Sequence, residues 1–351
     1  MSSITISSVA TVLPQYPIAE AEVKLYFQRV FSIDESRLNV MMSVIDNAQI
    51  HRRYCIHPIE QIIEPRSLTE LSQEYQEHSI RLGRRAASEA LEKAGILPRQ
   101  VDLIITVSCT GFMIPSLDAH LINQMGLRSD ARRLPVTELG CAAGAAMLGR
   151  ASDFLQARPD ATALVVAVEL PSLTFQRGNT SPANLISSIL FGDGAAAAVV
   201  TSKEAGGPRI LGTESYLFPD SIDAMGFDLK DGGFHIVLSR DVPEMIRQRI
   251  RGLVDCFLSR HGLTRGDVPA FVLHPGGQKL LSFVEQELEL EPSATKPSWD
   301  VLRECGNLSS ASVLFVLERW LGKGTMKPGD HGLLAAFGPG FSAEMLLLQW
   351  A

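Results

Sequence analysis

The sequence predicts an α/β protein whose main strands are buried on both faces. Strand-like and helix-like segments alternate along its 351 residues, as they do in layered α/β folds. The clearest strand-like segments are nearly continuous apolar runs and lie at 101–108, 163–168, 195–201, 269–273 and 332–337. Such runs are typical of strands covered by helices on both sides, because a strand with one face in solvent alternates polar and apolar residues.

Helical segments occupy much of the remaining chain. The clearest lie at 71–94, 141–157, 242–261, 278–289 and 308–321, and residues 1–10 are expected to form a first strand. Thr69 is expected to cap the first of these helices, since threonine is a favoured N-cap residue.

A polar, Gly- and Pro-containing stretch at 202–208 divides the chain into two parts. We expect an N-terminal half at 1–205 and a C-terminal half at 206–351, each with strands, helices and glycine-rich turns. The halves share no evident residue-level repeat, so their similarity is a hypothesis about topology.

Composition and charge argue against several classes of partner and of structural site. The net charge of −7 argues against nucleic acid or an anionic membrane as a partner, and no apolar run reaches the ~20 residues of a membrane span. The first ten residues lack the basic start and long apolar run of a signal peptide. The five cysteines are widely spaced and odd in number, which argues against a disulfide framework or a zinc cluster. These features predict a cytoplasmic protein without stable membrane insertion.

The segment LGCAAG at 139–144 places Cys141 between an apolar strand and a helix of small residues. A thiol on the first turn of a helix is exposed to the positive end of the helix dipole, which favours the thiolate. The flanking glycines allow a sharp turn and the close approach of a thioester. Cys141 is therefore a candidate nucleophile, with a buried structural cysteine as the alternative.

Two later residues supply the groups that a nucleophilic thiol needs. His274 leaves a buried strand directly before Pro-Gly-Gly, and Asn307 follows a glycine and opens a helix of small residues. Their alternatives are a satisfied polar group at a strand end and an ordinary helix cap. Together they form a Cys–His–Asn set divided between the two halves, which predicts a catalytic pocket between them.

The chain resembles the type III polyketide synthases, the chalcone-synthase-like enzymes. The segments LGCAAG, VLHPGG, CGNLSSAS and FGPGFSAE occur in the family's order and spacing, and SILFGDGAAAAVV and LSRDVPEMI also match. The resemblance implies the thiolase fold, in which two similar α/β halves form five layers (αβαβα), and a homodimer. It also implies CoA thioester substrates, with no metal, flavin or nicotinamide cofactor.

The resemblance also implies roles for particular residues. Cys141 matches the residue that carries the acyl chain, and His274 and Asn307 match those that stabilise the oxyanion and the enolate formed from malonyl-CoA. Phe191 and Phe234 match the family's gatekeepers, although each alone reads as a core aromatic. Further cavity positions are matched by Cys109, Thr174, Met225 and Pro339. Arg52 and Arg53, in IHRRY, match a basic segment that meets the CoA phosphates, although an arginine pair alone is usually a solvated face.

The product class follows from less specific features. SCTGF and the segment at 169–177 resemble bacterial members that accept long fatty acyl starters, so we expect an alkylpyrone or alkylresorcinol synthase that uses acyl-CoA and malonyl-CoA. A malonyl-only enzyme that forms tetrahydroxynaphthalene is the alternative within the family. More distant alternatives are an initiating β-ketoacyl carrier-protein synthase, which normally has His-Gln-Ala-Asn where this chain has His-Pro-Gly-Gly, and a non-enzymatic subunit of the same fold.

Overall fold

The computed structural model describes residues 3–203 and 205–351. Outside the described residues lie Met1 and Ser2, which belong to the expected first strand, and Glu204, which belongs to the expected boundary stretch. Within the described part, nine strands form one sheet in the order β11-β12-β13-β8-β1-β7-β6-β4-β5. Their bounds are β11 (Ala270–Leu273), β12 (His331–Gly338), β13 (Ser342–Gln349), β8 (Arg209–Leu217), β1 (Thr5–Val12), β7 (Gly194–Thr201), β6 (Thr162–Glu169), β4 (Leu103–Val107) and β5 (Arg132–Val136).

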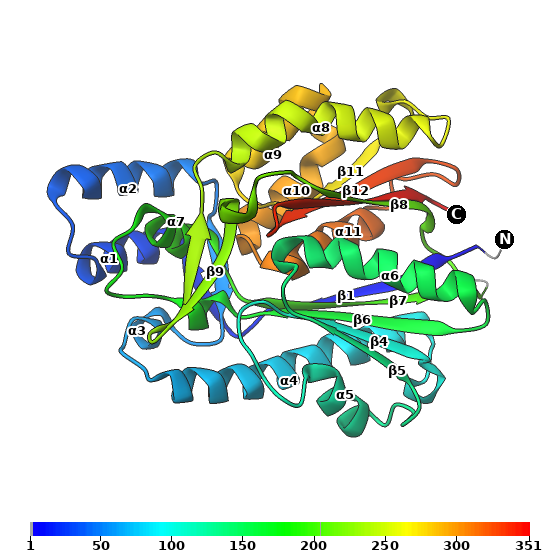
Figure 1. The fold of residues 1–351 in the computed structure, drawn as a ribbon, viewed down its shortest axis with the longest axis horizontal. Coiled ribbons are helices and arrows are strands. Elements are labelled where there is room, and N and C mark those ends of the chain that lie inside the picture. The colour runs from blue at the N-terminus through cyan, green and yellow to red at the C-terminus, as the bar shows by residue number, and fades with distance from the viewer. Residues whose placement is uncertain (1–2, 204) are drawn as a thin grey trace.

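The sheet consists of two parts that enclose a central pair of helices. Strands β1 and β8 pair only at Thr5 and Arg209, and on either side of this junction the two parts lie above and below the central helices (Figure 1). The central helices are α6 (Ala143–Ala157) and α11 (Ser312–Lys323). The outer helices are α4 (Leu68–Ala94) and α5 (Leu117–Met125) on one side, and α8 (Val242–Ser259) and α9 (Gln278–Leu288) on the other, with α10 (Pro292–Cys305) packed beside β11. The result is the five-layered αβαβα arrangement of the thiolase fold.

The strands are buried on both faces, as their apolar runs predict. In β6, Val165 and Ala167 pack into the core between the two sheet parts, whereas Leu164 and Val166 pack under α4 and α5. Because successive side chains of a strand point to opposite faces, a strand between two helix layers needs apolar residues at every position.

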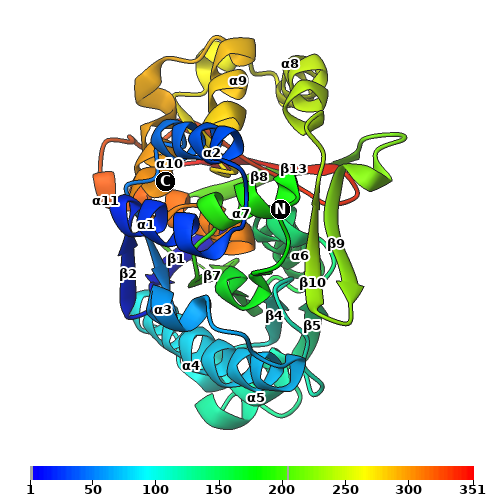
Figure 2. The same cartoon turned by 90° about the vertical axis from the view of Figure 1, so that its left-hand side faces the viewer.

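Additional elements gather at one end of the layers, the end that faces the viewer in Figure 2. They are α1 (Glu20–Val30), α2 (Glu35–Asn47), α3 (Ile59–Ile62), α7 (Pro182–Leu190) and the antiparallel pairs β2 (Tyr16–Ala19) with β3 (Arg52–Cys55) and β9 (Met225–Lys230) with β10 (Gly233–Leu238). Several of these elements form the walls of the cavity described below.

The start of α4 differs from the sequence prediction. Ser67, rather than Thr69, is its N-cap: Ser67 Oγ accepts a hydrogen bond from Glu70 N (3.2 Å), and Glu70 Oε2 accepts one from Ser67 N (2.8 Å). This reciprocal pair satisfies two backbone donors at once, whereas Thr69 already lies inside the first turn.

Candidate active site

Cys141 stands where β5 gives way to α6. It occupies a 3₁₀ turn (Gly140–Ala142) directly before α6, which is the position at a helix N-terminus that the sequence predicts. Gly140 makes this turn possible, because its φ of 47° lies in the left-handed region and a Cβ there would come within 2.6 Å of Pro339 Cδ. The thiol of Cys141 is therefore presented by backbone geometry that only glycine accommodates without strain.

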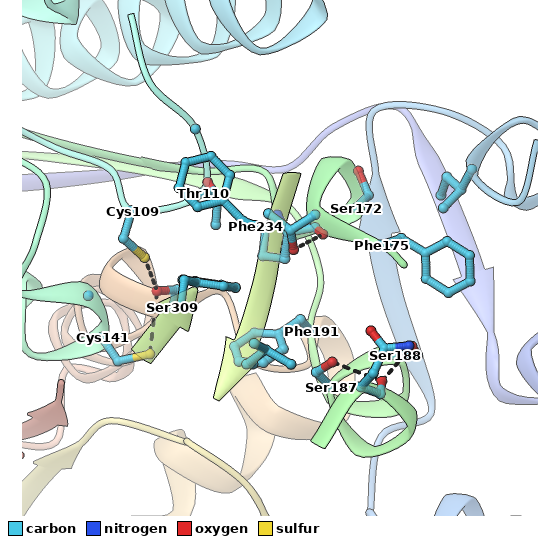
Figure 3. A pocket seen from close by; sticks show the side chains of 18 of the residues that line it. Cys109, Thr110, Cys141, Ser172, Phe175, Ser187, Ser188, Phe191, Phe234 and Ser309 are labelled. Atoms are coloured by element: carbon cyan, nitrogen blue, oxygen red, sulfur yellow. Dashed lines mark hydrogen bonds between the residues drawn. The ribbon is translucent and has the colours of Figure 1, made fainter. Parts of the chain in front are cut away.

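Two thiols converge on one hydroxyl. The Cys141 thiol donates a hydrogen bond to Ser309 Oγ at 3.4 Å, and Cys109 Sγ lies at the same distance from that oxygen (Figure 3). Cys109 follows β4, and Ser309 begins the turn before α11, so the three residues come from separate parts of the chain. Ser309 is not among the residues predicted from the sequence, although it lies two residues after Asn307 in CGNLSSAS.

Asn307 connects Ser309 to the segment that carries His274. Asn307 Oδ1 accepts a hydrogen bond from Ser309 N (2.8 Å), and Asn307 Nδ2 donates one to Gly276 O (3.2 Å). His274 lies two residues before Gly276, directly after β11, and its backbone N donates to Ala335 O (2.9 Å). Cys141 and Asn307 are thus linked through Ser309, and Asn307 is linked to the segment of His274 through the backbone of Gly276.

His274 and Asn307 are buried, with exposed fractions of 2% and 3%. His274 Nδ1 is shielded from solvent and has no hydrogen-bond partner among the described residues. A buried ring nitrogen without a partner is rare, which makes His274 a candidate for a role beyond packing.

Burial dominates the electrostatics of this site. It raises the pKa of Cys141 to about 12, while the hydrogen bond to Ser309 acts in the opposite direction. Burial likewise lowers the pKa of His274 to about 4. The sequence favours a thiolate on account of the helix N-terminus, but desolvation outweighs that effect and holds both side chains in their neutral forms.

Glu169 is a further residue that sequence analysis did not single out. It ends β6, is fully buried, and accepts hydrogen bonds from Cys109 N (3.1 Å), Thr110 Oγ1 (2.9 Å) and Ser310 Oγ. Burial raises the pKa of Glu169. The pKa of Cys109 is raised well above its ordinary value, mainly by burial and also by the charge of Glu169. A carboxylate that closes an otherwise apolar strand was the available signal in the sequence.

A cavity of about 580 Å³ opens in front of Cys141. Each of the predicted cavity residues lies in its wall: Cys109, Thr174, Phe191, Met225, Phe234 and Pro339. Phe191 follows α7 and Phe234 belongs to β10, and Figure 3 shows both rings beside the cavity. The far end is apolar, with walls from α1, α3 and the residues that flank them.

The predicted arginine pair separates in the structure. Arg52 is exposed and its Nη1 donates to Tyr54 Oη at 3.3 Å, whereas Arg53 is buried and lines the cavity. The two are consecutive residues of β3, so their side chains point to opposite faces. Only Arg52 therefore has the surface position that a contact with CoA phosphates requires.

Comparison with known proteins identifies the family. The N-terminal domain of the chalcone and stilbene synthases matches residues 2–204, and the C-terminal domain matches residues 210–350. The chain belongs to this family, the type III polyketide synthases. It is therefore an acyltransferase that performs condensations, and the predicted family is confirmed.

Relatives agree over nearly the whole chain. It is 35% identical to a putative chalcone synthase of Bacillus subtilis over 98% of both chains. It is 38% identical to 1,3,6,8-tetrahydroxynaphthalene synthase of Streptomyces peucetius, over 99% of this chain and 93% of that one. The crystal structure of the Streptomyces coelicolor tetrahydroxynaphthalene synthase has a TM-score of 0.95 and 36% identity, with 99% of each chain covered. This likeness confirms the predicted thiolase fold.

The described residues contain no group of three or more His, Cys, Asp or Glu side chains arranged to hold a metal ion. None of their helices combines the length and the apolar character needed to cross a membrane.

Proposed function

We propose that this synthase condenses a medium- or long-chain fatty acyl-CoA starter with several malonyl-CoA units and cyclises the chain to an alkylpyrone or alkylresorcinol. The apolar part of the cavity wall carries the proposal: Val23 and Phe27 of α1 and Ile59 and Ile62 of α3 all line the cavity. Each CH₂ group that moves from water to such surroundings gains ~0.8 kcal/mol, or about fourfold in affinity.

We assign the loading step to Cys141. Its sulfur attacks the starter thioester, the bond to the CoA sulfur breaks, and the thiol proton passes through His274 to that sulfur. The neutral imidazole of His274 has one unprotonated nitrogen, which can receive this proton and return it.

His274 and Asn307 are proposed to stabilise the condensation step. Malonyl-CoA loses carbon dioxide, and the electron pair of the broken bond forms an enolate that attacks the Cys141 thioester. The reaction needs donors for negative charge rather than a strong base. The N–H of a neutral imidazole and the amide of Asn307 are donors of this kind.

Mass spectrometry of the products tests the proposal. Purified enzyme, malonyl-CoA and starters from acetyl-CoA to long-chain acyl-CoA are expected to yield pyrones or resorcinols whose mass increases with the starter. The C141A variant, which retains the cavity but lacks the nucleophile, is the matched control. Products whose mass does not depend on the starter would contradict the proposal.

A malonyl-only synthase is the second candidate. It is favoured by the 38% identity to an enzyme described as tetrahydroxynaphthalene synthase. Malonyl-CoA alone, without a starter, separates the two candidates: efficient formation of an aromatic product would support this one.

We further propose that Arg52 binds a CoA phosphate at the cavity entrance. Its exposed guanidinium supports this role, because guanidinium groups pair well with phosphate. We expect the R52M substitution to raise the KM of every CoA ester, and unchanged KM values would refute the assignment.

We also propose a homodimer and a boundary between halves near residue 205. An exposed apolar surface supports the dimer: Leu134 lies on edge strand β5, and Phe112 and Ile114 lie on the loop after β4, with exposed fractions of 38%, 60% and 82%. Light scattering of the purified protein is expected to give twice the mass of the chain, and a monomer at micromolar concentration would contradict the dimer.

A further inference from the structure

Arg53 is a buried cation in the wall of the cavity. It is 4% exposed and extends from β3 towards α7, where its Nη1 donates to Ser188 O at 3.0 Å. Ile18 and Cys55, which flank it in the wall, are apolar. The guanidinium therefore lies in surroundings from which water is largely excluded.

This charge lacks a counter-ion. Arg53 forms no ion pair with a carboxylate of the described residues, and its buried Nε has no hydrogen-bond partner among them. Glu20 exerts only a minor effect on it and pairs instead with Lys24 at 2.7 Å. Burial lowers the pKa of Arg53 to about 10, so the side chain stays protonated at neutral pH. A buried charge in this state is costly unless an anion from outside the chain completes the site.

Neighbouring polar groups are already engaged. Ser187 and Ser188 donate their hydroxyl protons to Asn184 O at 2.9 and 2.8 Å. Of the described residues that line the cavity, Arg53 alone carries a positive charge. An anionic group at this end of the cavity would therefore be recognised by Arg53 rather than by the α7 hydroxyls.

The condensation reaction restricts which substrate anion would gain from a contact with Arg53. A malonyl carboxylate that leaves as carbon dioxide is hindered by a cation, because the ion pair stabilises the ground state more than the transition state. A carboxylate that stays on the chain gains from the same contact. The free end of a dicarboxylic starter is such a group, and the malonyl group is the shortest member of that class.

We propose that Arg53 binds the terminal carboxylate of a dicarboxylic acyl starter, so that the cavity accepts ω-carboxyacyl-CoA esters besides alkyl acyl-CoA esters and prefers them at equal chain length. This inference rests on the proposed function, since it names the starter class for the same cavity. Arg53 acts here as a specificity-determining residue in the wall of the cavity.

The test compares two starters of one length, octanoyl-CoA and octanedioyl-CoA, by the kcat/KM for acyl loading and by the intact mass of the loaded protein. The wild type is expected to favour the octanedioyl ester at least tenfold, and R53M is expected to lose that preference. R53K retains the positive charge but lacks the planar guanidinium group, so it is expected to keep part of the preference for the octanedioyl ester. R52M serves as the matched control from the opposite face of β3, and it should affect both esters equally.

The outcomes separate the two proposals. If octanoyl-CoA loads well but the preference is the same in wild type and R53M, the inference about Arg53 is overturned and the proposed function stands. If neither ester loads onto the wild type, both proposals fail.

A measurement on the wild type alone covers the case in which R53M does not fold. Free octanedioate is expected to inhibit loading at concentrations at least tenfold lower than octanoate. Equal inhibition by the two acids would overturn the role of Arg53.

Discussion

Replacing Gly140 by alanine tests how Cys141 is positioned. Gly140 has a φ of 47°, and an added Cβ would lie 2.6 and 2.8 Å from Pro339 Cδ and Cγ. The left-handed backbone costs a residue with a Cβ about 1–2 kcal/mol, and overpacking a closely filled site costs about 1–3 kcal/mol. We therefore expect G140A to lower the free energy of unfolding by about 2–5 kcal/mol.

The same substitution should impair loading. Relief of the contact with Pro339 must move the turn that carries Cys141, and a displacement of ~1 Å at a reacting atom can reduce the rate by about 100-fold. Urea unfolding measures the stability, and intact mass after a timed incubation with acyl-CoA measures the loading.

Gly126 provides the matched control. Its φ is 68°, but a Cβ there would meet no atom within 4 Å, so G126A carries the backbone cost without the clash. We expect G126A to lose only about 1–2 kcal/mol and to load at the wild-type rate. If G140A behaves like G126A in both assays, the contact with Pro339 does not position Cys141.

The remaining predictions concern ionisation and the nucleophile. C141A is expected to stay folded, as judged by circular dichroism, and to take up no acyl group from acyl-CoA. Burial lowers the pKa of His274 from 6.5 to about 4. The stability that depends on neutral His274 should therefore be fully present above pH 6.5 and be lost as the pH falls towards 4. In urea unfolding, H274Q should reduce this dependence of the free energy of unfolding on pH. The Glu169 charge raises the pKa of Cys141 and the Ser309 hydrogen bond lowers it, so E169Q should speed and S309A should slow alkylation of Cys141 by iodoacetamide at a given pH. Equal alkylation rates in both variants would contradict this account.

Local patterns in the sequence predict the elements of the fold well. The run ALVVAV marks β6, which extends from Thr162 to Glu169, and the strand expected at 332–337 lies inside β12. The starts of helices are harder to predict, because several residues near one end can act as caps. Ser67 is the cap of α4 because Glu70 completes a reciprocal pair with it, and Thr69 has no such partner.

For the candidate site, too, the sequence predicts some features and leaves others to the structure. The order of LGCAAG, VLHPGG and CGNLSSAS indicates the residue types and the family, but it does not show that Ser309 accepts a hydrogen bond from the Cys141 thiol or that Glu169 supports Cys109. Those contacts join residues from 60 to 168 positions apart, and sequence spacing carries no information about such distances.

By itself, the sequence determined the fold class and the burial of the strands on both faces, and it predicted Cys141, His274 and Asn307 as a candidate set, because strand period, helix termini and motifs are local properties. Only the tertiary structure decided the neutral state of Cys141 and His274, since desolvation depends on everything packed around them. It also decided the position of Arg53, for which the family resemblance implies a contact with CoA phosphates and which the structure buries in the wall of the cavity. The physical reason is the same in both cases. The residue type sets which charge a group can carry, but burial sets the free energy of carrying that charge, and burial is created by parts of the chain that are distant in sequence.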